Sequence, residues 1–148
     1  MTRINTIDVQ DLLDQHLMAE YRELPMVAGS LRRSLKSKRG VTGIPDQYTL
    51  NQGHVKFFYN KKLYLQQRYR ELLVELISRE YQLDPTRRPD FDTFNAIPNV
   101  KWTPTSDDHK ILISRLIERV RQRPDFYRMR GKRVDVEEYI QHLQEKYL

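Results

Sequence analysis

The first 25 residues place charged side chains on the apolar face of a predicted helix, and no other feature of the sequence limits the possible folds as strongly. At about 100° per residue, one helical face carries Val9, Leu12, Leu13, His16, Leu17, Glu20 and Leu24. Glu23 lies at the edge of that face. Carboxylates on a core face cost free energy unless they are paired, hydrogen-bonded or turned toward a cleft. The pattern therefore predicts a packed helix whose two carboxylates have partners or border a cleft.

Start and stop signals place this helix and three more. The candidate caps of the first helix are Asn5, Thr6 and Asp8. Pro25 ends or kinks it, and apolar residues at spacing four predict more helix up to about Lys36. The other helices are expected over residues 63–82, 106–123 and 135–147. Asp135 and Glu138 resemble a capping box at the start of the last one.

The remaining segments are expected to be irregular. Residues 48–62 contain a Gly-His turn, and residues 83–105 contain four prolines and form a long connection that Trp102 pins to the core. One helical turn is expected near Asp90–Phe94. The fold class is therefore all-α, as a single domain over residues 1–148 with three main helices. A short C-terminal helical extension covers residues 133–148.

The charge distribution points to a polyanionic partner. The formal net charge is +6, with −3 in residues 1–25, +7 in residues 26–80, −1 in residues 81–100 and +6 in residues 101–133. The two basic blocks, on either side of the acidic residues 81–100, favour nucleic acid, and a solvated basic surface is the equal alternative. There is no cysteine, no membrane-length apolar run and no signal-peptide pattern. These features fit a cytoplasmic protein.

Two N-terminal runs closely resemble the phage-type pyrimidine-dimer DNA glycosylases with AP-lyase activity, the endonuclease V family. The runs are Thr2–Asn5 and Gln15–Pro25, the latter an eleven-residue contiguous match. Later matches are Gly53-His54-Val55, Phe57-Phe58-Tyr59, Gln122-Arg123-Pro124, Tyr127 and Gly131-Lys132. The resemblance covers roughly residues 1–132 and leaves residues 133–148 uncovered.

Thr2 and Glu23 are the catalytic residues that the resemblance implies. Removal of Met1 before a small residue would expose the Thr2 α-amine, whose ordinary pKa of about 7.7–8.0 leaves a useful fraction uncharged at neutral pH. Taken alone, a threonine at position 2 indicates only an efficiently processed terminus. Glu23 would stabilise an oxocarbenium-like centre and accept a proton in β-elimination. His16 and Glu20 are expected to fix Glu23 or to form a buried pair.

The resemblance also implies a DNA-binding surface. Its expected members are Arg3, Arg22, Arg115, Arg119, Phe126 and Tyr127. Arginines suit phosphate contacts, and Arg115 and Arg119 share a helical face because they lie four apart. Aromatic rings can stack on bases. The plain alternatives are solvated surface cations and a hydrophobic C-terminal anchor.

Two positions depart from the family pattern. Met26 stands where an arginine that grips phosphate is expected, and Phe126 stands where an indole is typical. The first departure weakens the expected phosphate clamp, and the second affects lesion preference. Neither changes Thr2 or Glu23.

The sequence as a whole predicts a DNA repair enzyme for cyclobutane pyrimidine dimers that acts as a monomer on kinked duplex DNA with an extruded base. No cofactor is expected, and the four histidines lack metal-ligand spacing. The alternatives are a glycosylase/lyase for another lesion and a non-enzymatic basic helical DNA-binding protein.

Overall fold

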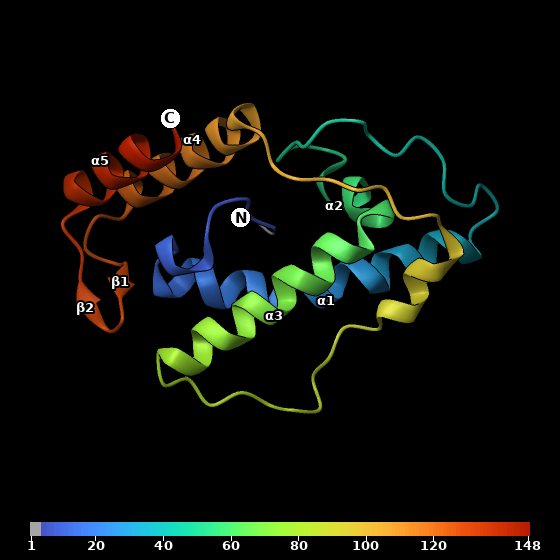
Figure 1. Ribbon diagram of the computed structural model, residues 1–148, viewed down its shortest axis with the longest axis horizontal. Helices are drawn as coiled ribbons and strands as arrows, with labels where there is room; N and C mark the ends of the chain where they lie inside the picture. Colours follow the sequence, from blue (N-terminus) through green and yellow to red (C-terminus); the bar gives the residue numbers. More distant parts are fainter. Residues whose placement is uncertain (1–3) are drawn as a thin grey trace.

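The long helix α1 (Asp14–Lys36) lies at the centre of the molecule in the computed structural model, which describes residues 4–148. Helix α3 (Lys62–Ser78) crosses it, and α4 (Ser106–Gln122) pairs with α5 (Val136–Tyr147) on the other side (Figure 1). Short elements complete the chain: 3-10 turns η1 (Val9–Asp11), η2 (Phe58–Asn60) and η3 (Phe91–Ala96), helix α2 (His54–Phe57), and strands β1 (Arg128–Met129) and β2 (Lys132–Arg133). The all-α prediction is confirmed.

The prediction that the N-terminal helix fills most of residues 1–25 is wrong in its first half. Helix α1 begins only at Asp14, and Leu13 occupies the N-cap position without a side-chain cap. The expected caps Asn5, Thr6 and Asp8 therefore do not cap it. Residues 4–8, which we call the N-terminal arm, run between α4 on one side and α1 and α3 on the other (Figure 1).

The arm is not helical because its backbone groups are bound by side chains from elsewhere. The Ile4 N–H donates to His54 Nε2 at 3.1 Å, and the Ile4 carbonyl accepts from the Tyr48 hydroxyl at 2.8 Å. The Asn5 carbonyl accepts from the Tyr64 hydroxyl at 2.8 Å. Buried backbone groups need partners, and here tertiary contacts supply them in place of a helical turn.

Helix α1 continues through Pro25 to Lys36, as the apolar spacing after the proline predicted. Val27 and Leu31 are almost completely buried, whereas Leu35 is exposed at the end of the helix. Proline removes one backbone donor and crowds the preceding turn. The burial of apolar residues on both sides of Pro25 offsets this cost, so the helix does not end there.

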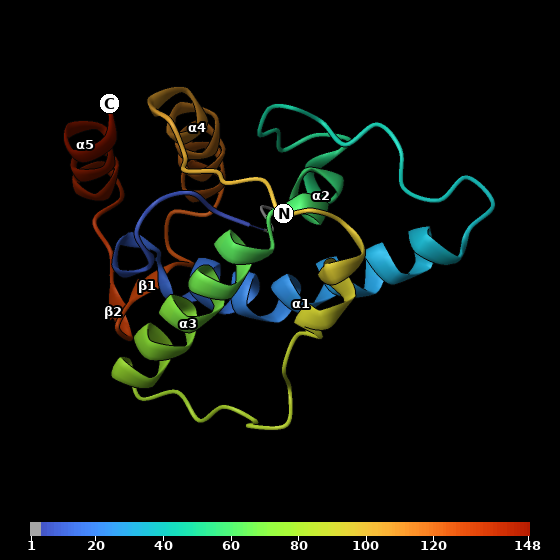
Figure 2. The ribbon, with the colours of Figure 1, turned by 45° about the vertical axis from the view of Figure 1, so that its right-hand side comes forward.

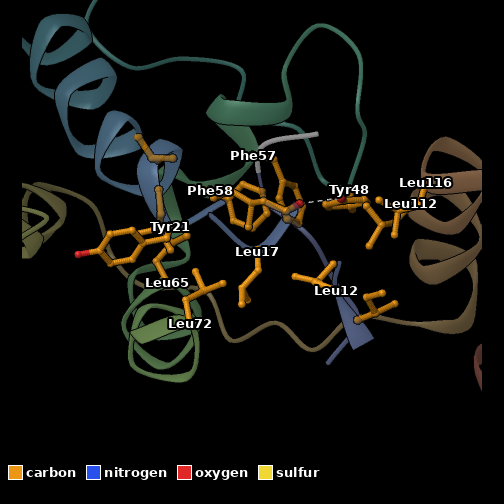
Figure 3. Packing of buried hydrophobic residues seen from close by; sticks show 14 of the residues in the cluster. Leu12, Leu17, Tyr21, Tyr48, Phe57, Phe58, Leu65, Leu72, Leu112 and Leu116 are labelled. Atoms are coloured by element: carbon orange, nitrogen blue, oxygen red, sulfur yellow. Dashed lines mark hydrogen bonds between the residues drawn. The ribbon is translucent and has the colours of Figure 1, made fainter. Parts of the chain in front are cut away.

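The core joins the apolar faces of α1 and α3 to a cluster of aromatic rings. Leu17 and Tyr21 of α1 pack near Leu65 and Leu72 of α3, while the rings of Phe57 and Phe58 gather above them (Figure 3). Trp102 joins these rings, with its centroid 4.6 Å from Tyr64 and 5.0 Å from Phe57. The prediction that Trp102 pins the long connection to the core is confirmed.

The other predicted boundaries agree with the structure to within a few residues. Thr105 and Asp108 form a complete capping box at the start of α4, and the Asp135 carboxylate accepts from the Glu138 N–H at 3.0 Å at the start of α5. Helix α3 ends at Ser78, four residues before the predicted Gln82. Residues 48–62, expected to be irregular, instead contain α2 and η2. Within residues 4–148, no helix is long and apolar enough to cross a membrane.

Candidate active site

One face of α1 borders two neighbouring cavities. The larger cavity has a volume of about 830 Å³, and its lining includes Gln15, Ala19, Arg22, Glu23, Met26 and Arg128. The smaller cavity has a volume of about 360 Å³ and is lined by Gln15, His16, Arg119, Gln122, Arg123, Phe126 and Tyr127. Gln15 belongs to both walls. This face therefore collects predicted site residues from α1, from α4 and from the loop after α4.

Asp14 holds the β1–β2 hairpin against the first turn of α1. Its carboxylate accepts from the Arg130 N–H at 3.0 Å and from the Gly131 N–H at 2.8 Å, and it pairs with Arg79 at 3.0 Å. Arg130 and Gly131 have φ angles of +50° and +79°, the conformation that a two-residue type I′ turn requires. Figure 2 shows the hairpin beside the start of α1. The carboxylate thus fixes the edge of the larger cavity.

Gln15 holds the loop that carries the two aromatic residues. Its side-chain amide donates to the Phe126 carbonyl at 2.8 Å and accepts from the Arg128 N–H at 3.1 Å. Both halves of the amide are therefore used on the same stretch of backbone. This contact places Phe126 and Tyr127 over the first turn of α1, where the Tyr127 ring contacts His16.

The two aromatic residues have different surroundings. Tyr127 is buried, and its ring centroid lies 4.7 Å from that of His16. Phe126 is 41% exposed, and the Arg123 guanidinium lies 3.7 Å from the centre of its ring. Phe126 is thus accessible for stacking, while Tyr127 anchors the loop.

His16 is neutral at physiological pH. Burial and the neighbouring Arg119 cation lower the pKa of His16 to about 4. His16 Nδ1 and Arg119 Nε are both buried and lack a hydrogen-bond partner within the described part of the chain. Buried polar atoms are normally satisfied, so these two atoms are exceptions in the wall of the smaller cavity.

Glu20 forms a buried pair, but its partner is Arg68 of α3 and not His16, with which the sequence suggested a pair. Its carboxylate pairs with Arg68 of α3 at 2.6 Å and 2.9 Å and accepts from the Asn5 side-chain amide at 2.6 Å. Arg68 also donates to the Ile7 carbonyl at 2.6 Å. The Glu20–Arg68 pair therefore ties the N-terminal arm to α1 and α3.

Several of these positioning residues were missed from the sequence. Arg68 left a readable signal, since it lies between Leu65 and Leu72 on the apolar face of α3 and therefore needed a buried partner. Asp14 and Gln15 left none, because the backbone groups that they bind lie more than 100 residues away along the chain.

The remaining predicted site residues that the structure describes are Arg22, Glu23 and Arg115. Glu23 is half-buried in the wall of the larger cavity, beside exposed Arg22 and Met26. Met26 is 54% exposed at the position where the family resemblance implied an arginine. Arg115 is half-buried on α4, one turn before Arg119. Thr2 and Arg3 lie outside the described residues.

A protein-family model supports the resemblance seen in the sequence. The model described as pyrimidine dimer DNA glycosylase matches residues 1–89. The match contains the arm, α1, α2 and α3, and therefore the turn of Glu20 and Glu23. Helices α4 and α5 and the hairpin lie beyond it.

Proposed function

This chain belongs to the pyrimidine dimer DNA glycosylase family, and we propose that it cleaves the N-glycosidic bond of cyclobutane pyrimidine dimers through a Schiff base on the Thr2 α-amine. Family membership makes it a DNA repair glycosylase, with DNA as its substrate. The finer proposal is that one amine serves two steps. In the first step the amine adduct cleaves the N-glycosidic bond, and in the second step the abasic strand is nicked by β-elimination. The enzyme is proposed to act as a monomer.

The attachment of the N-terminal arm carries this proposal. Asn5 is bound to Glu20, and Glu23 lies three residues further along α1, about 5–6 Å away between Cβ atoms. Chain connectivity limits the Thr2 Cα to about 7 Å from that of Ile4, at roughly 3.6 Å per residue. This attachment of the arm supports the proposal that the amine acts at the Glu23 wall of the larger cavity.

The chemistry needs only groups that the chain supplies. The amine nitrogen bonds to C1′ of the damaged nucleoside while the C1′–N bond breaks, and its electron pair leaves with the pyrimidine. Loss of the amine proton and opening of the sugar ring give an imine. A base then removes a C2′ proton, the C3′–O bond breaks and the phosphate leaves. The Glu23 carboxylate would stabilise the first transition state and accept the C2′ proton.

The surrounding cations and aromatics suit the substrate. Arg22 and Arg115 would contact phosphates, and Arg119 with neutral His16 would bind a polar group in the smaller cavity. Phe126 would stack on an unstacked base. These contacts would hold a kinked duplex so that C1′ is accessible to the amine.

Reductive trapping tests this function directly. Borohydride added to the protein with a dimer-containing or abasic duplex should yield a covalent protein–DNA adduct. Protein with an uncleaved N-terminal extension, which blocks the Thr2 amine, should form no adduct and should lose base release and strand nicking together. If processed protein binds the duplex without forming an adduct, the enzymatic proposal fails and a non-enzymatic DNA-binding role is supported instead. Duplexes with other lesions define the substrate range.

A further inference from the structure

We propose that helix α5 is a clamp on the chain segment that leads to the N-terminal amine, with Asp11, Lys146 and Tyr147 as positioning residues for the reaction. The inference rests on the proposed function and adds a residue-level role for a helix that the family match does not reach. It concerns the placement of the nucleophile rather than contact with DNA.

Asp11 is the centre of the clamp. Its side chain is 9% exposed, and its carboxylate binds three side chains of α5. Lys146 Nζ lies 2.7 Å from one carboxylate oxygen, which also accepts from the Tyr147 hydroxyl, and His142 Nε2 lies 2.8 Å from the other. Burial acts to raise the pKa of Asp11, but the hydrogen bonds from Lys146, Tyr147 and His142 outweigh it and lower that pKa. The carboxylate therefore stays ionised and bound.

The same α5 residues also contact Asp8, the last residue of the arm. The Asp8 N–H donates to the Tyr147 hydroxyl at 3.0 Å, and the Asp8 carboxylate lies 3.0 Å from Lys146 Nζ. The Tyr139 hydroxyl donates to the Asp11 carbonyl at 2.6 Å. Helix α5 therefore binds both backbone and side chains over residues 8–11.

A third contact extends the clamp toward the N-terminus. The Thr6 hydroxyl is hydrogen-bonded to His109 Nδ1 of α4 at 2.9 Å, and the His109 ring lies 5.2 Å from that of Tyr147. On the opposite side, Asn5 and Ile7 are bound by the Glu20–Arg68 pair. The arm is therefore held from two sides, and loss of the α5 side would let it shift relative to Glu23.

The test removes the Lys146 and Tyr147 contacts without truncating the helix. The double variant Lys146→Met with Tyr147→Phe keeps most of the side-chain volume. It removes the Lys146 donor to Asp8 and Asp11, the Tyr147 donor to Asp11 and the acceptor of the Asp8 N–H, while His142 and Tyr139 still contact Asp11. The matched control is Gln141→Ala with Glu145→Gln, because these two exposed residues bond to each other, at 2.9 Å, on the same helix. Three quantities are measured: the single-turnover rate constant of borohydride trapping on saturating abasic duplex, the Kd for that duplex, and amide hydrogen exchange of the arm without DNA.

The double variant should trap about tenfold more slowly, because a small displacement of a reacting group is costly, while the Kd stays unchanged. Exchange of the Ile4 and Asp8 amides should accelerate, and the control should match the wild type in all three measurements. Lys146→Arg, which keeps the charge, should retain a near-normal trapping rate. If the double variant does not fold, Tyr147→Phe alone should show the same pattern with a smaller effect.

An unchanged trapping rate, a loss that follows DNA affinity, or an equal loss in the control would each overturn the clamp. The exchange experiment needs no activity. If the wild type forms no adduct, the proposed function fails. In that case, amide hydrogen exchange of the arm still tests whether α5 holds the arm. Unaltered exchange in the double variant would refute this contact.

Discussion

Glu20 and Glu23 lie less than one helical turn apart on α1 but have different surroundings. Glu20 is fully buried against Arg68, whereas Glu23 lies in the wall of the larger cavity. A carboxylate enclosed by an arginine and an amide is suited to holding structure. One that borders a cavity is suited to acting on a substrate.

Glu23→Gln should therefore separate chemistry from folding. Base release from a dimer duplex should fall by about 10² or more, the usual scale for loss of an acid–base group or a preorganised charge. DNA affinity should be retained, because a carboxylate repels phosphates. Near-normal base release would contradict the role, as would a loss explained by unfolding.

Glu20→Gln is the matched control. It should reduce the free energy of unfolding by about 3 kcal/mol or more, because it leaves the buried Arg68 cation without a charged partner. Urea denaturation of both variants measures the contrast. If the two substitutions destabilised the protein equally, their roles would not differ as proposed.

His16 predicts a specific pH dependence of stability. Its folded-state pKa of about 4 lies below the ordinary 6.5, so between these values the unfolded chain binds a proton that the folded chain does not. Acidification from about pH 6.5 to 4 therefore favours unfolding, by at most about 3 kcal/mol for this residue. His16→Gln should lose less stability than the wild type over that window in urea denaturation. Parallel losses would show that His16 is not held neutral.

Among the structural elements, the turn of the β1–β2 hairpin is held to α1 by the Asp14 carboxylate. Asp14→Ala should lower the free energy of unfolding by about 2–3 kcal/mol, because it removes the acceptor of two backbone N–H groups and one partner of Arg79. Arg79 keeps Glu75 at 2.8 Å, which limits the loss. The matched control Asp125→Asn should have little effect, since its pair with Arg133 is exposed. Thermal melts compare the two, and equal shifts would show that Asp14 does not hold the hairpin.

The elements that could be predicted from sequence are those decided by local patterns. Apolar spacing located α3, α4 and α5, and Thr105–Asp108 and Asp135 mark helix starts by contacts within four residues. The start of α1 could not be predicted, because Ile4 and Asn5 bind side chains some 15 to 60 residues away. Val9, Leu12 and Leu13 are compatible with both a helix and the observed irregular segment. Their apolar pattern carries no information about the partners of Ile4 and Asn5.

The residues of the candidate site also divide into those that the sequence could identify and those that depend on tertiary contacts. The contiguous run from Gln15 to Pro25 brought Glu23 and Arg22 to attention through family resemblance. The side chains that hold the site, such as Asp14 and Arg68, act through the tertiary fold. Periodicity alone placed Glu20 and Glu23 on or beside one face, and only the position of Arg68 on α3 separates their roles.

For the whole molecule, the charge on α4 is divided between two faces. Arg119 lines the smaller cavity and Arg115 lies one turn before it, whereas Arg121 pairs with Glu137 of α5 at 3.3 Å. A DNA duplex that lies over the cavities would contact the first face. The second face is covered in part by α5.

DNA association should weaken steeply with salt, because bound arginines displace condensed counterions. Replacing Arg115 and Arg119 with Ala should flatten the slope of log affinity against log salt by about 1 to 2 units if each contacts phosphate. Arg121→Ala is the matched control from the same helix and should leave the slope unchanged. Fluorescence anisotropy across a salt series measures both. An unchanged slope in the double variant, or an equal change in the control, would assign Arg115 and Arg119 to a solvated surface and move the phosphate contacts elsewhere.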